Sequence, residues 1–214
     1  MQLLLDSAIV NEARQAVAWG WVKSATTNPT LLAQSKLPPA QTLKELAATL
    51  PGQIFYQLTA DNLEDMRLEA AKAADILGAK LVLKIPATPL GFQATVQLSQ
   101  KYPCAVTSIF TPAQAMTAHC AGARYALYYH NRAKRLLPAG QGERLASELV
   151  QVLAGTGTEV VAASLKSPAE IVEARQAGVA MLSAKFEVLA LLPCNEFSEQ
   201  AVQDFKATGS GLLN

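Results

Sequence analysis

The feature that most constrains the fold of this chain is a regular alternation between short apolar runs and longer segments with helical periodicity. Several of the runs are continuously apolar, for example 81–83 and 160–163. Such runs are typical of strands in a parallel sheet that is covered on both faces. The pattern predicts eight strands, at Gln2–Asp6, Gly20–Thr26, Gln53–Gln57, Lys80–Ile85, Cys104–Phe110, Arg124–Tyr129, Thr158–Ser164 and Val179–Ala184.

The segments between these strands carry signals that start and stop helices. A capping residue precedes a proline in Asn28-Pro29, Thr111-Pro112 and Ser167-Pro168. Another helix is predicted to open with Asp61 as its cap and to run over 62–77. Gly78, Gly122 and Gly178 each fall between a helix and the next strand, where a left-handed residue is expected.

Eight strands, each followed by helical sequence, predict an α/β protein with the (β/α)8 TIM-barrel fold, in a single domain over 1–214. A doubly wound open sheet would share the alternation, but such a sheet has no support here because the chain lacks a glycine-rich phosphate loop. Residues 195–214 are predicted to form a C-terminal helix and tail, which could pack on a neighbouring subunit.

Composition excludes several classes of function. Half of the residues are hydrophobic and the net charge is +1, so no broad attraction to nucleic acid or to an acidic membrane is expected. Arg132, Lys134 and Arg135 are interpreted as a solvated loop. Three cysteines and two histidines form no metal-ligand pattern, so no metal is expected. Without a signal peptide or a membrane span, the expected location is cytoplasmic.

Polar residues stand at the ends of the predicted strands, where the chemistry of a barrel is located. One such residue is ordinary, because strands commonly end in caps, but eight strand ends that converge on one rim predict an active site. The residues are Asp6, Thr26, Thr27, Asn28, Gln57, Lys84, Thr107, Ser108, Tyr129, Asn131, Ser164 and Ser183.

Lys84 is the most informative of them, because apolar residues flank it on both sides. Desolvation disfavours an ammonium and lowers its pKa, which would leave a free amine able to attack a carbonyl. The alternative, about equally weighted, is a lysine at a strand end with its head group in solvent. Lys80, at the start of the same strand, is expected to lie at the surface.

Four further residues could serve the same chemistry. Asp6 could accept hydrogen bonds from a substrate hydroxyl, or it could cap the following helix. Gln57, Thr107 and Tyr129 could hold a water between them, with Tyr129 as the acid–base group. The alternatives are a buried amide bonded to backbone for Gln57 and an aromatic ring packed under a loop for Tyr129.

A phosphate site is predicted at the end of the seventh strand. Ser164 lies there, before a helix whose N-terminus offers backbone N–H groups to an anion, and Arg132 would add a fork-shaped donor. The alternative for Arg132 is a solvent-facing loop charge. Lys166 is interpreted as a surface residue.

Five stretches also resemble motifs of the small transaldolase family, and within it they are most similar to fructose-6-phosphate aldolases. They lie at 5–7, 25–30, 82–88, 129–132 and 162–168, in the family's order and spacing. The Thr-Thr-Asn-Pro stretch at 26–29 and the lysine strand at 83–88 are together specific. The resemblance extends from Gln2 to about Lys206.

The resemblance implies a class I aldolase in which Lys84 forms a Schiff base. Asp6 and Asn28 would contact dihydroxyacetone hydroxyls, while Gln57, Thr107 and Tyr129 would position a water and move protons. The sugar-phosphate substrate would also be bound by Thr26, Asn131, Arg132 and Ser164, with Arg132 and Ser164 on the phosphate. The resemblance implies no metal or organic cofactor, and a homo-oligomer, a pentamer or a decamer.

Three hypotheses follow for the activity. The first is cleavage of fructose 6-phosphate to dihydroxyacetone and glyceraldehyde 3-phosphate. The second is a transaldolase, which hands the dihydroxyacetone unit to an aldose phosphate. Transaldolases typically carry Glu in place of Gln57 and Phe in place of Tyr129, which favours the first. The third is a non-catalytic barrel, against which Lys84 and Asp6 argue. Residues 133–138 depart from the family pattern and leave the aldehyde open.

Overall fold

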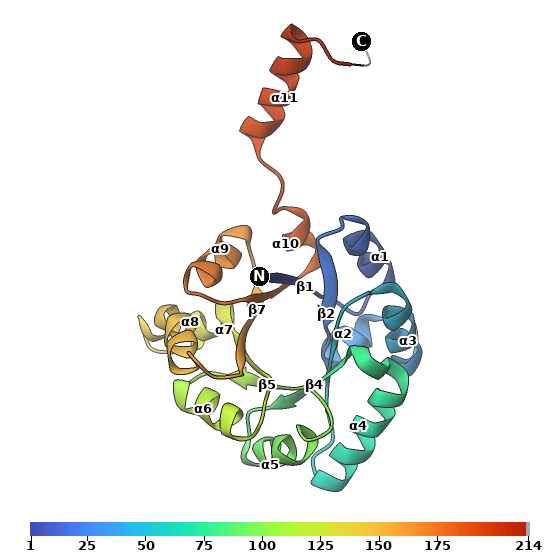
Figure 1. Ribbon diagram of the computed structural model, residues 1–214, viewed down its shortest axis with the longest axis vertical. Helices are drawn as coiled ribbons and strands as arrows, with labels where there is room; N and C mark the ends of the chain where they lie inside the picture. Colours follow the sequence, from blue (N-terminus) through green and yellow to red (C-terminus); the bar gives the residue numbers. More distant parts are fainter. Residues whose placement is uncertain (213–214) are drawn as a thin grey trace.

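A computed structural model describes residues 1–212 and has a closed barrel of eight parallel strands at its centre (Figure 1). Each strand pairs with the next along the chain and the last pairs with the first, so the barrel leaves no free sheet edge. The strands are β1 (Gln2–Asp6), β2 (Val22–Thr26), β3 (Ile54–Gln57), β4 (Leu81–Pro86), β5 (Cys104–Ile109), β6 (Tyr125–Tyr129), β7 (Glu159–Leu165) and β8 (Met181–Ala184). The prediction of a (β/α)8 barrel is confirmed, and every predicted strand overlaps an observed one.

Helices surround this barrel and connect its strands on the outside (Figure 1). They are α1 (Val10–Ala18), α2 (Pro29–Gln34), α3 (Pro39–Thr49), α4 (Leu63–Leu77), α5 (Pro89–Leu98), α6 (Pro112–Cys120), α7 (His130–Leu136), α8 (Gln141–Val152), α9 (Pro168–Gln176), α10 (Phe186–Ala190) and α11 (Glu196–Thr208), with a 3-10 turn at Gly78–Lys80.

The predicted helix caps are confirmed at three helices. The side chains of Asn28, Thr111 and Ser167 each accept a hydrogen bond from a backbone N–H in the first turn of the helix that follows. The predicted cap of α4 is wrong, because Asn62 and not Asp61 accepts the N–H of Asp65, at 2.9 Å.

Two apolar layers hold the barrel together. The inner layer fills the barrel with side chains from its strands, and the outer layer lies between the strands and the helices. Phe55 and Tyr125 contact each other in the inner layer, with ring centroids 5.2 Å apart. The inner layer closes the barrel below the strand ends, so only the rim is left for polar chemistry.

Two expectations about basic residues are wrong. Lys80 does not extend into solvent, because its ammonium donates to the carbonyls of Ala47 and Leu50 at 2.6 and 2.7 Å and so caps the end of α3. Arg132, Lys134 and Arg135, interpreted as a solvated loop, lie in the helix α7. Lys134 of that helix donates to Glu173 of α9 at 2.9 Å.

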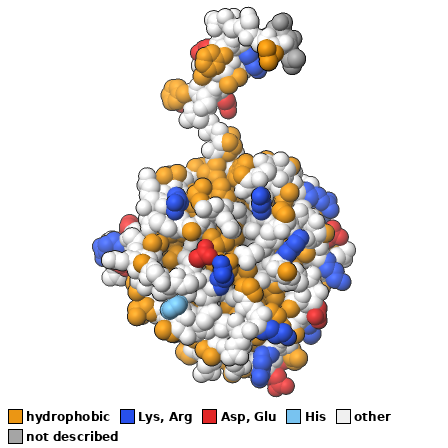
Figure 2. Space-filling model, viewed as in Figure 1, with side chains coloured by type: hydrophobic (Ala, Val, Ile, Leu, Met, Phe, Trp, Pro, Cys, Tyr) orange, Lys and Arg blue, Asp and Glu red, His pale blue; other side chains and the backbone are white. Residues whose placement is uncertain are grey.

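The last helix, α11, stands apart from the barrel (Figure 1). None of its residues is buried, and Figure 2 shows hydrophobic side chains on it that the barrel does not cover. The predicted C-terminal helix is therefore present, whereas residues 213–214 of the predicted tail lie outside the described residues. No helix within residues 1–212 is long and apolar enough to cross a membrane.

Candidate active site

A cavity of about 520 Å³ opens at the C-terminal ends of the strands. Seven of the ten residues to which the family resemblance assigns a role line it, namely Asp6, Asn28, Gln57, Lys84, Tyr129, Arg132 and Ser164. They come from five strands or from the segments that directly follow a strand. The closed barrel thus brings together residues that lie far apart in the sequence.

Lys84 lies at the base of this cavity with only 2 % of its surface exposed. Its side-chain nitrogen donates to the carbonyl of Thr27 at 2.8 Å. That carbonyl is held in place because the N–H and the hydroxyl of Thr27 both donate to the carbonyl of Phe55, each at 2.9 Å. Burial lowers the pKa of Lys84, and the negative potential of Tyr129 and Asp6 opposes the shift only in part. The arrangement favours a neutral, nucleophilic amine.

Asp6 ends β1 and is held by a relay of two hydroxyls from neighbouring strands. The Thr26 hydroxyl donates to Oδ1 of Asp6 at 2.7 Å and lies 2.6 Å from the hydroxyl of Ser183. Thr26 therefore acts on the cavity through Asp6. With one carboxylate oxygen engaged in this way, the other is available to a hydroxyl in the cavity.

Tyr129 ends β6 on the opposite side of the barrel. Its hydroxyl lies 3.2 Å from the Thr107 hydroxyl and accepts a longer bond from Ser108 at 3.4 Å. The guanidinium carbon of Arg132 lies 4.6 Å from the ring centroid, a cation–π contact. Gln57 lines the same cavity and pairs in register with Lys84. The three residues predicted to hold a water thus lie around the cavity that contains the amine.

Asn28 has two roles that the sequence presented as separate signals. Its Oδ1 accepts the N–H of Leu31 at 2.9 Å and caps α2. Its side chain also lines the cavity. Because capping uses only the oxygen, the amide N–H groups of Asn28 are left to donate to a ligand.

Basic side chains gather on the β6–β8 side of the cavity. Arg132 follows β6, Lys166 follows β7, and Lys185 follows β8, and all three line the cavity with Ser164. Asp6 is the single carboxylate among the lining residues. Loops after the seventh and eighth strands are where barrels of this type commonly bind phosphate. This side of the cavity is therefore suited to an anion.

Two serines on this rim have backbone conformations that are rare for residues other than glycine. Ser108 has φ 64° and Ser164 has φ 60°, each at a register shift within its strand, and both line the cavity. Such conformations typically cost about 1–3 kcal/mol and persist where surrounding contacts enforce them. Here they turn the ends of β5 and β7 toward the cavity.

Comparison with known proteins agrees with this geometry. A family model described as Transaldolase/Fructose-6-phosphate aldolase matches residues 3–208. The chain belongs to this family. It is 34 % identical over 208 residues to a probable transaldolase of Kosmotoga olearia, which covers 96 % of this chain and 94 % of that protein. It is 32 % identical over 195 residues to a probable transaldolase of Aquifex aeolicus, covering 90 % and 88 %.

Solved structures of mandelate oxidase share the fold alone. The structure with benzoyl-formic acid has a TM-score of 0.64 and 15 % identity, and covers 95 % of this chain and 70 % of that one. The structure with (S)-2-phenylpropionate has a TM-score of 0.63 and 17 % identity, with the same coverage. Membership in the transaldolase/fructose-6-phosphate aldolase family makes the chain an enzyme of the aldolase/transaldolase type and sets aside the non-catalytic barrel.

Three of the predicted site residues do not line the cavity of this family member. Thr26 and Thr107 lie behind it, in contact with Asp6 and Tyr129. Asn131 is turned the other way, and its amide donates to Glu170 of α9 at 2.7 Å. The structure gives no support to direct substrate binding by Asn131.

Sequence reasoning also missed two residues. Lys166, interpreted as a surface residue, lines the cavity, as does Lys185, which was not considered. Lys185 is half exposed, and its nearest carboxylate is Glu187 at 3.8 Å. Its position at the end of the eighth strand, where phosphate sites are common, was the signal that could have found it.

The lowered pKa of Lys84 generates a prediction about stability. Between that lowered pKa and about 10.4, the usual lysine pKa in an unfolded chain, the unfolded chain holds a proton that the folded chain has released. Stability conferred by Lys84 therefore rises with pH across this window. Lys84→Met removes the buried amine, so this variant should be more stable than wild type at pH 7 by about 0.5–2 kcal/mol.

Denaturant unfolding of both proteins between pH 6 and 10 measures this difference, which should shrink as the pH rises. Lys101→Met, at an exposed lysine, controls for the general effect of alkaline pH. A difference between wild type and Lys84→Met that is independent of pH would contradict the assignment.

Proposed function

We propose that the protein is a class I aldolase that cleaves fructose 6-phosphate reversibly to dihydroxyacetone and glyceraldehyde 3-phosphate, with Lys84 as the Schiff-base lysine. The observation that carries the proposal is the Lys84 amine, 2 % exposed and hydrogen-bonded to one backbone carbonyl at the base of the rim cavity. An amine of this kind can attack a ketone, and a fully solvated ammonium cannot.

The reaction begins when the Lys84 amine attacks C2 of the ketose and the carbonyl oxygen leaves as water, forming an iminium. Removal of the O4 proton then breaks the C3–C4 bond and releases glyceraldehyde 3-phosphate. The electron pair of that bond remains on the lysine adduct as an enamine. Protonation at C3 and addition of one water release dihydroxyacetone and restore the amine.

Residues around Lys84 divide these steps between them. Asp6 accepts a hydrogen bond from a hydroxyl of the three-carbon unit, and the Asn28 amide donates to another. Tyr129, with its hydroxyl 3.2 Å from that of Thr107, exchanges protons with the reacting water, which Gln57 helps to hold. The phosphate of the aldehyde half is bound on the β6–β8 side by Arg132, Ser164, Lys166 and Lys185.

The choice of aldolase over transaldolase rests on Gln57 and Tyr129. With an amide in place of a carboxylate and a phenol in place of a phenyl group, the water beside the enamine has a proton donor, so the enamine is protonated and dihydroxyacetone is released. The alternative is a transaldolase, which the names of the two relatives favour. In that case the enamine waits for a second aldehyde. The expected cytoplasmic location stays a prediction.

A first experiment tests the activity itself. Fructose 6-phosphate without an added acceptor should yield free dihydroxyacetone in stoichiometric amount with glyceraldehyde 3-phosphate. Borohydride should trap a three-carbon adduct on Lys84, and Lys84→Met should reduce turnover by at least about 10³-fold while the fold is retained. If dihydroxyacetone appears only as a transferred unit once erythrose 4-phosphate is added, the protein is a transaldolase.

A second prediction concerns Gln57. Gln57→Glu should raise the ratio of transfer to cleavage by about tenfold, or ~1.4 kcal/mol between the two barriers, because a carboxylate holds the proton that the enamine would otherwise receive. Both products are measured in one mixture with erythrose 4-phosphate as acceptor. Gln34→Glu places the same charge at an exposed position of the cavity lining. An equal product ratio in both variants would count against the role of Gln57.

We also propose that α11 packs on a neighbouring subunit in a ring-shaped homo-oligomer, a pentamer or a decamer. Phe197 and Phe205 are 76 % and 72 % exposed on a helix of 13 residues with no buried residue. A helix of that length is marginal by itself in water and needs an apolar surface against which to pack. An arm that reaches from one subunit to the next makes a head-to-tail contact, which closes into a ring.

Substituting both aromatic residues tests this arrangement. Phe197→Asp combined with Phe205→Asp should convert the oligomer to monomers, because each carboxylate would have to be buried against an apolar surface. Light scattering after size exclusion measures the mass. Gln203→Asp, on the opposite face of α11, should leave the mass of the oligomer unchanged. A double variant that keeps the wild-type mass would exclude α11 from the interface.

A further inference from the structure

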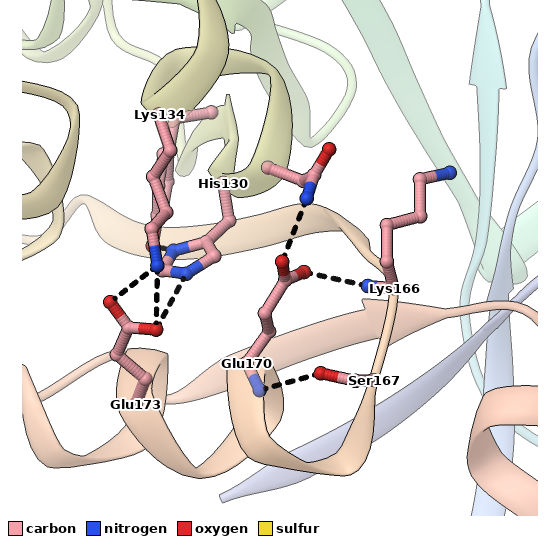
Figure 3. A network of polar contacts seen from close by, with 8 residues as sticks. His130, Lys134, Lys166, Ser167, Glu170 and Glu173 are labelled. Carbon is pink, nitrogen blue, oxygen red and sulfur yellow. Dashed lines mark hydrogen bonds and ion pairs between the residues drawn. The ribbon is translucent and has the colours of Figure 1, made fainter.

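The side of the cavity proposed to bind phosphate depends on two segments that come from different strands. One is the end of β7 with the turn to α9 that follows it, which together carry Ser164 and Lys166. The other is the first turn of α7, which carries Arg132. A phosphate can be held by both segments only if their spacing is fixed before the substrate arrives. The carboxylate of Glu170 on α9 contacts both segments (Figure 3).

We propose that Glu170 is a positioning residue, which clamps α7 to the β7–α9 turn and thereby fixes the spacing of the phosphate-binding groups. This inference rests on the proposed function of the cavity. Oε2 of Glu170 accepts the backbone N–H of Lys166 at 2.7 Å, and Oε1 accepts the Asn131 amide at 2.7 Å. Glu170 itself does not line the cavity.

Each of the two contacts is made next to a residue that lines the cavity. Asn131 directly precedes Arg132 on α7. The Lys166 N–H lies two residues after Ser164, whose φ of 60° must be enforced by its surroundings. In Figure 3 the Lys166 side chain extends away from Glu170, while its backbone N–H is bonded to that carboxylate. Glu170 thus fixes the backbone and leaves the ammonium available to a ligand.

Ordinary helix capping does not account for these contacts. A capping box would bond the Glu170 side chain to the N–H of Ser167. The Ser167 side chain does accept the Glu170 N–H, at 3.2 Å, but the Glu170 carboxylate reaches one residue further back, to Lys166, and across to α7. The bond between Glu170 and Asn131 joins α9 to α7, two helices that lie outside the paired strands of the barrel.

The chemistry of the clamp requires a group that accepts two hydrogen bonds, because both of its partners are donors. An ionised carboxylate does this, and its bonds are stronger than those of a neutral acceptor. A glutamine at this position could still accept the Lys166 N–H, although as a neutral acceptor it would hold that donor less strongly than a carboxylate does. Its N–H2 would pair with a carboxylate at position 131 as the Asn131 amide now pairs with Glu170, so exchanging donor and acceptor between the two positions offers a reciprocal test.

The test compares glyceraldehyde 3-phosphate with unphosphorylated glyceraldehyde as the acceptor of dihydroxyacetone in the synthetic direction. Glu170→Ala and Asn131→Asp should each raise KM for glyceraldehyde 3-phosphate by about tenfold, with little change in kcat and in KM for glyceraldehyde. The expected effect of Asn131→Asp arises because its carboxylate would face the carboxylate of Glu170, and the two would repel each other. The double variant Asn131→Asp with Glu170→Gln restores one donor and one acceptor, so KM should return to within about twofold of wild type.

Glu173→Ala is the matched control, on the same helix one turn further on. Glu173 bonds Lys134 and lies 3.5 Å from Nε2 of the buried His130, so it also joins α9 to α7, but it contacts neither Asn131 nor the β7–α9 turn (Figure 3). Its loss should lower the melting temperature without raising KM for the phosphorylated acceptor. If Glu173→Ala and Glu170→Ala raise that KM equally, or if the double variant is no better than Asn131→Asp, the clamp is wrong and Glu170 supports only the fold.

The same variants distinguish failure of the clamp from failure of the proposed reaction. If wild type does not turn over any of these substrates, calorimetry with inorganic phosphate measures the affinity of the cavity for an anion without a reaction. Weaker phosphate binding in Glu170→Ala, recovered in the swapped double variant relative to Asn131→Asp, supports the clamp without the aldolase reaction. Equal phosphate binding in wild type and Glu170→Ala overturns the clamp.

Discussion

The interaction on which the site depends is the single hydrogen bond from the Lys84 amine to the carbonyl of Thr27. A buried ammonium is stabilised most by a carboxylate bonded directly to it, and here Asp6 lies in the same cavity but is bonded to Thr26. A backbone carbonyl can accept a hydrogen bond from a neutral amine and adds no full negative charge. Burial therefore keeps the pKa of Lys84 lowered, which favours the neutral amine that the proposed reaction requires.

The closed barrel makes this arrangement possible, because it supplies walls on every side. The inner apolar layer, which includes Phe55, excludes water below the amine. Phe55 also fixes the partner of the amine, since its carbonyl accepts both hydrogen bonds from Thr27. The cost in free energy is concentrated at the rim, in a buried amine and in the left-handed backbone of Ser108 and Ser164. Hydrogen bonds between all eight strands of the closed barrel offset that cost. An open sheet would have two unpaired edge strands and would offset it less.

The sequence predicted the strands because they depend on local pattern, since continuous apolar runs of this length favour buried parallel strands. It singled out Lys84 by its apolar neighbours, but gave a head group in solvent about equal weight. The orientation of Asn131 could not be predicted in the same way. Asn131 and Arg132 are consecutive residues of a helix and point about 100° apart, so only one of them can face the cavity. Before α7 was known to be a helix, both were equally good candidates.

The surroundings of two lysines also could not be predicted from local sequence. Lys80 and Lys84 lie in one predicted strand, yet the first caps α3, because a turn places it beside the carbonyls of Ala47 and Leu50. That contact joins positions 30 or more residues apart and leaves no local trace in the sequence. Lys185 illustrates the converse, since only its position directly after the predicted eighth strand distinguishes it from a surface lysine. Its place at the end of the eighth strand brings it to the cavity.

The proposed reaction assigns bond-making and recognition largely to different parts of the rim, and this division has a consequence for substrate range. Asp6, Gln57 and Lys84 lie on β1, β3 and β4, respectively, whereas Arg132, Lys166 and Lys185 follow β6, β7 and β8. The carboxylates near the cations, on α9, are placed behind the cavity wall, where they hold backbone and helix without repelling an anion. Changes in 133–138 or in α9 can therefore alter the spacing of the cations while the strand that holds the amine stays the same. Substrate preference can vary in such a barrel without a change in its chemistry, because the contacts of the proposed clamp lie on α7, α9 and the turn before α9, away from the strand that carries Lys84.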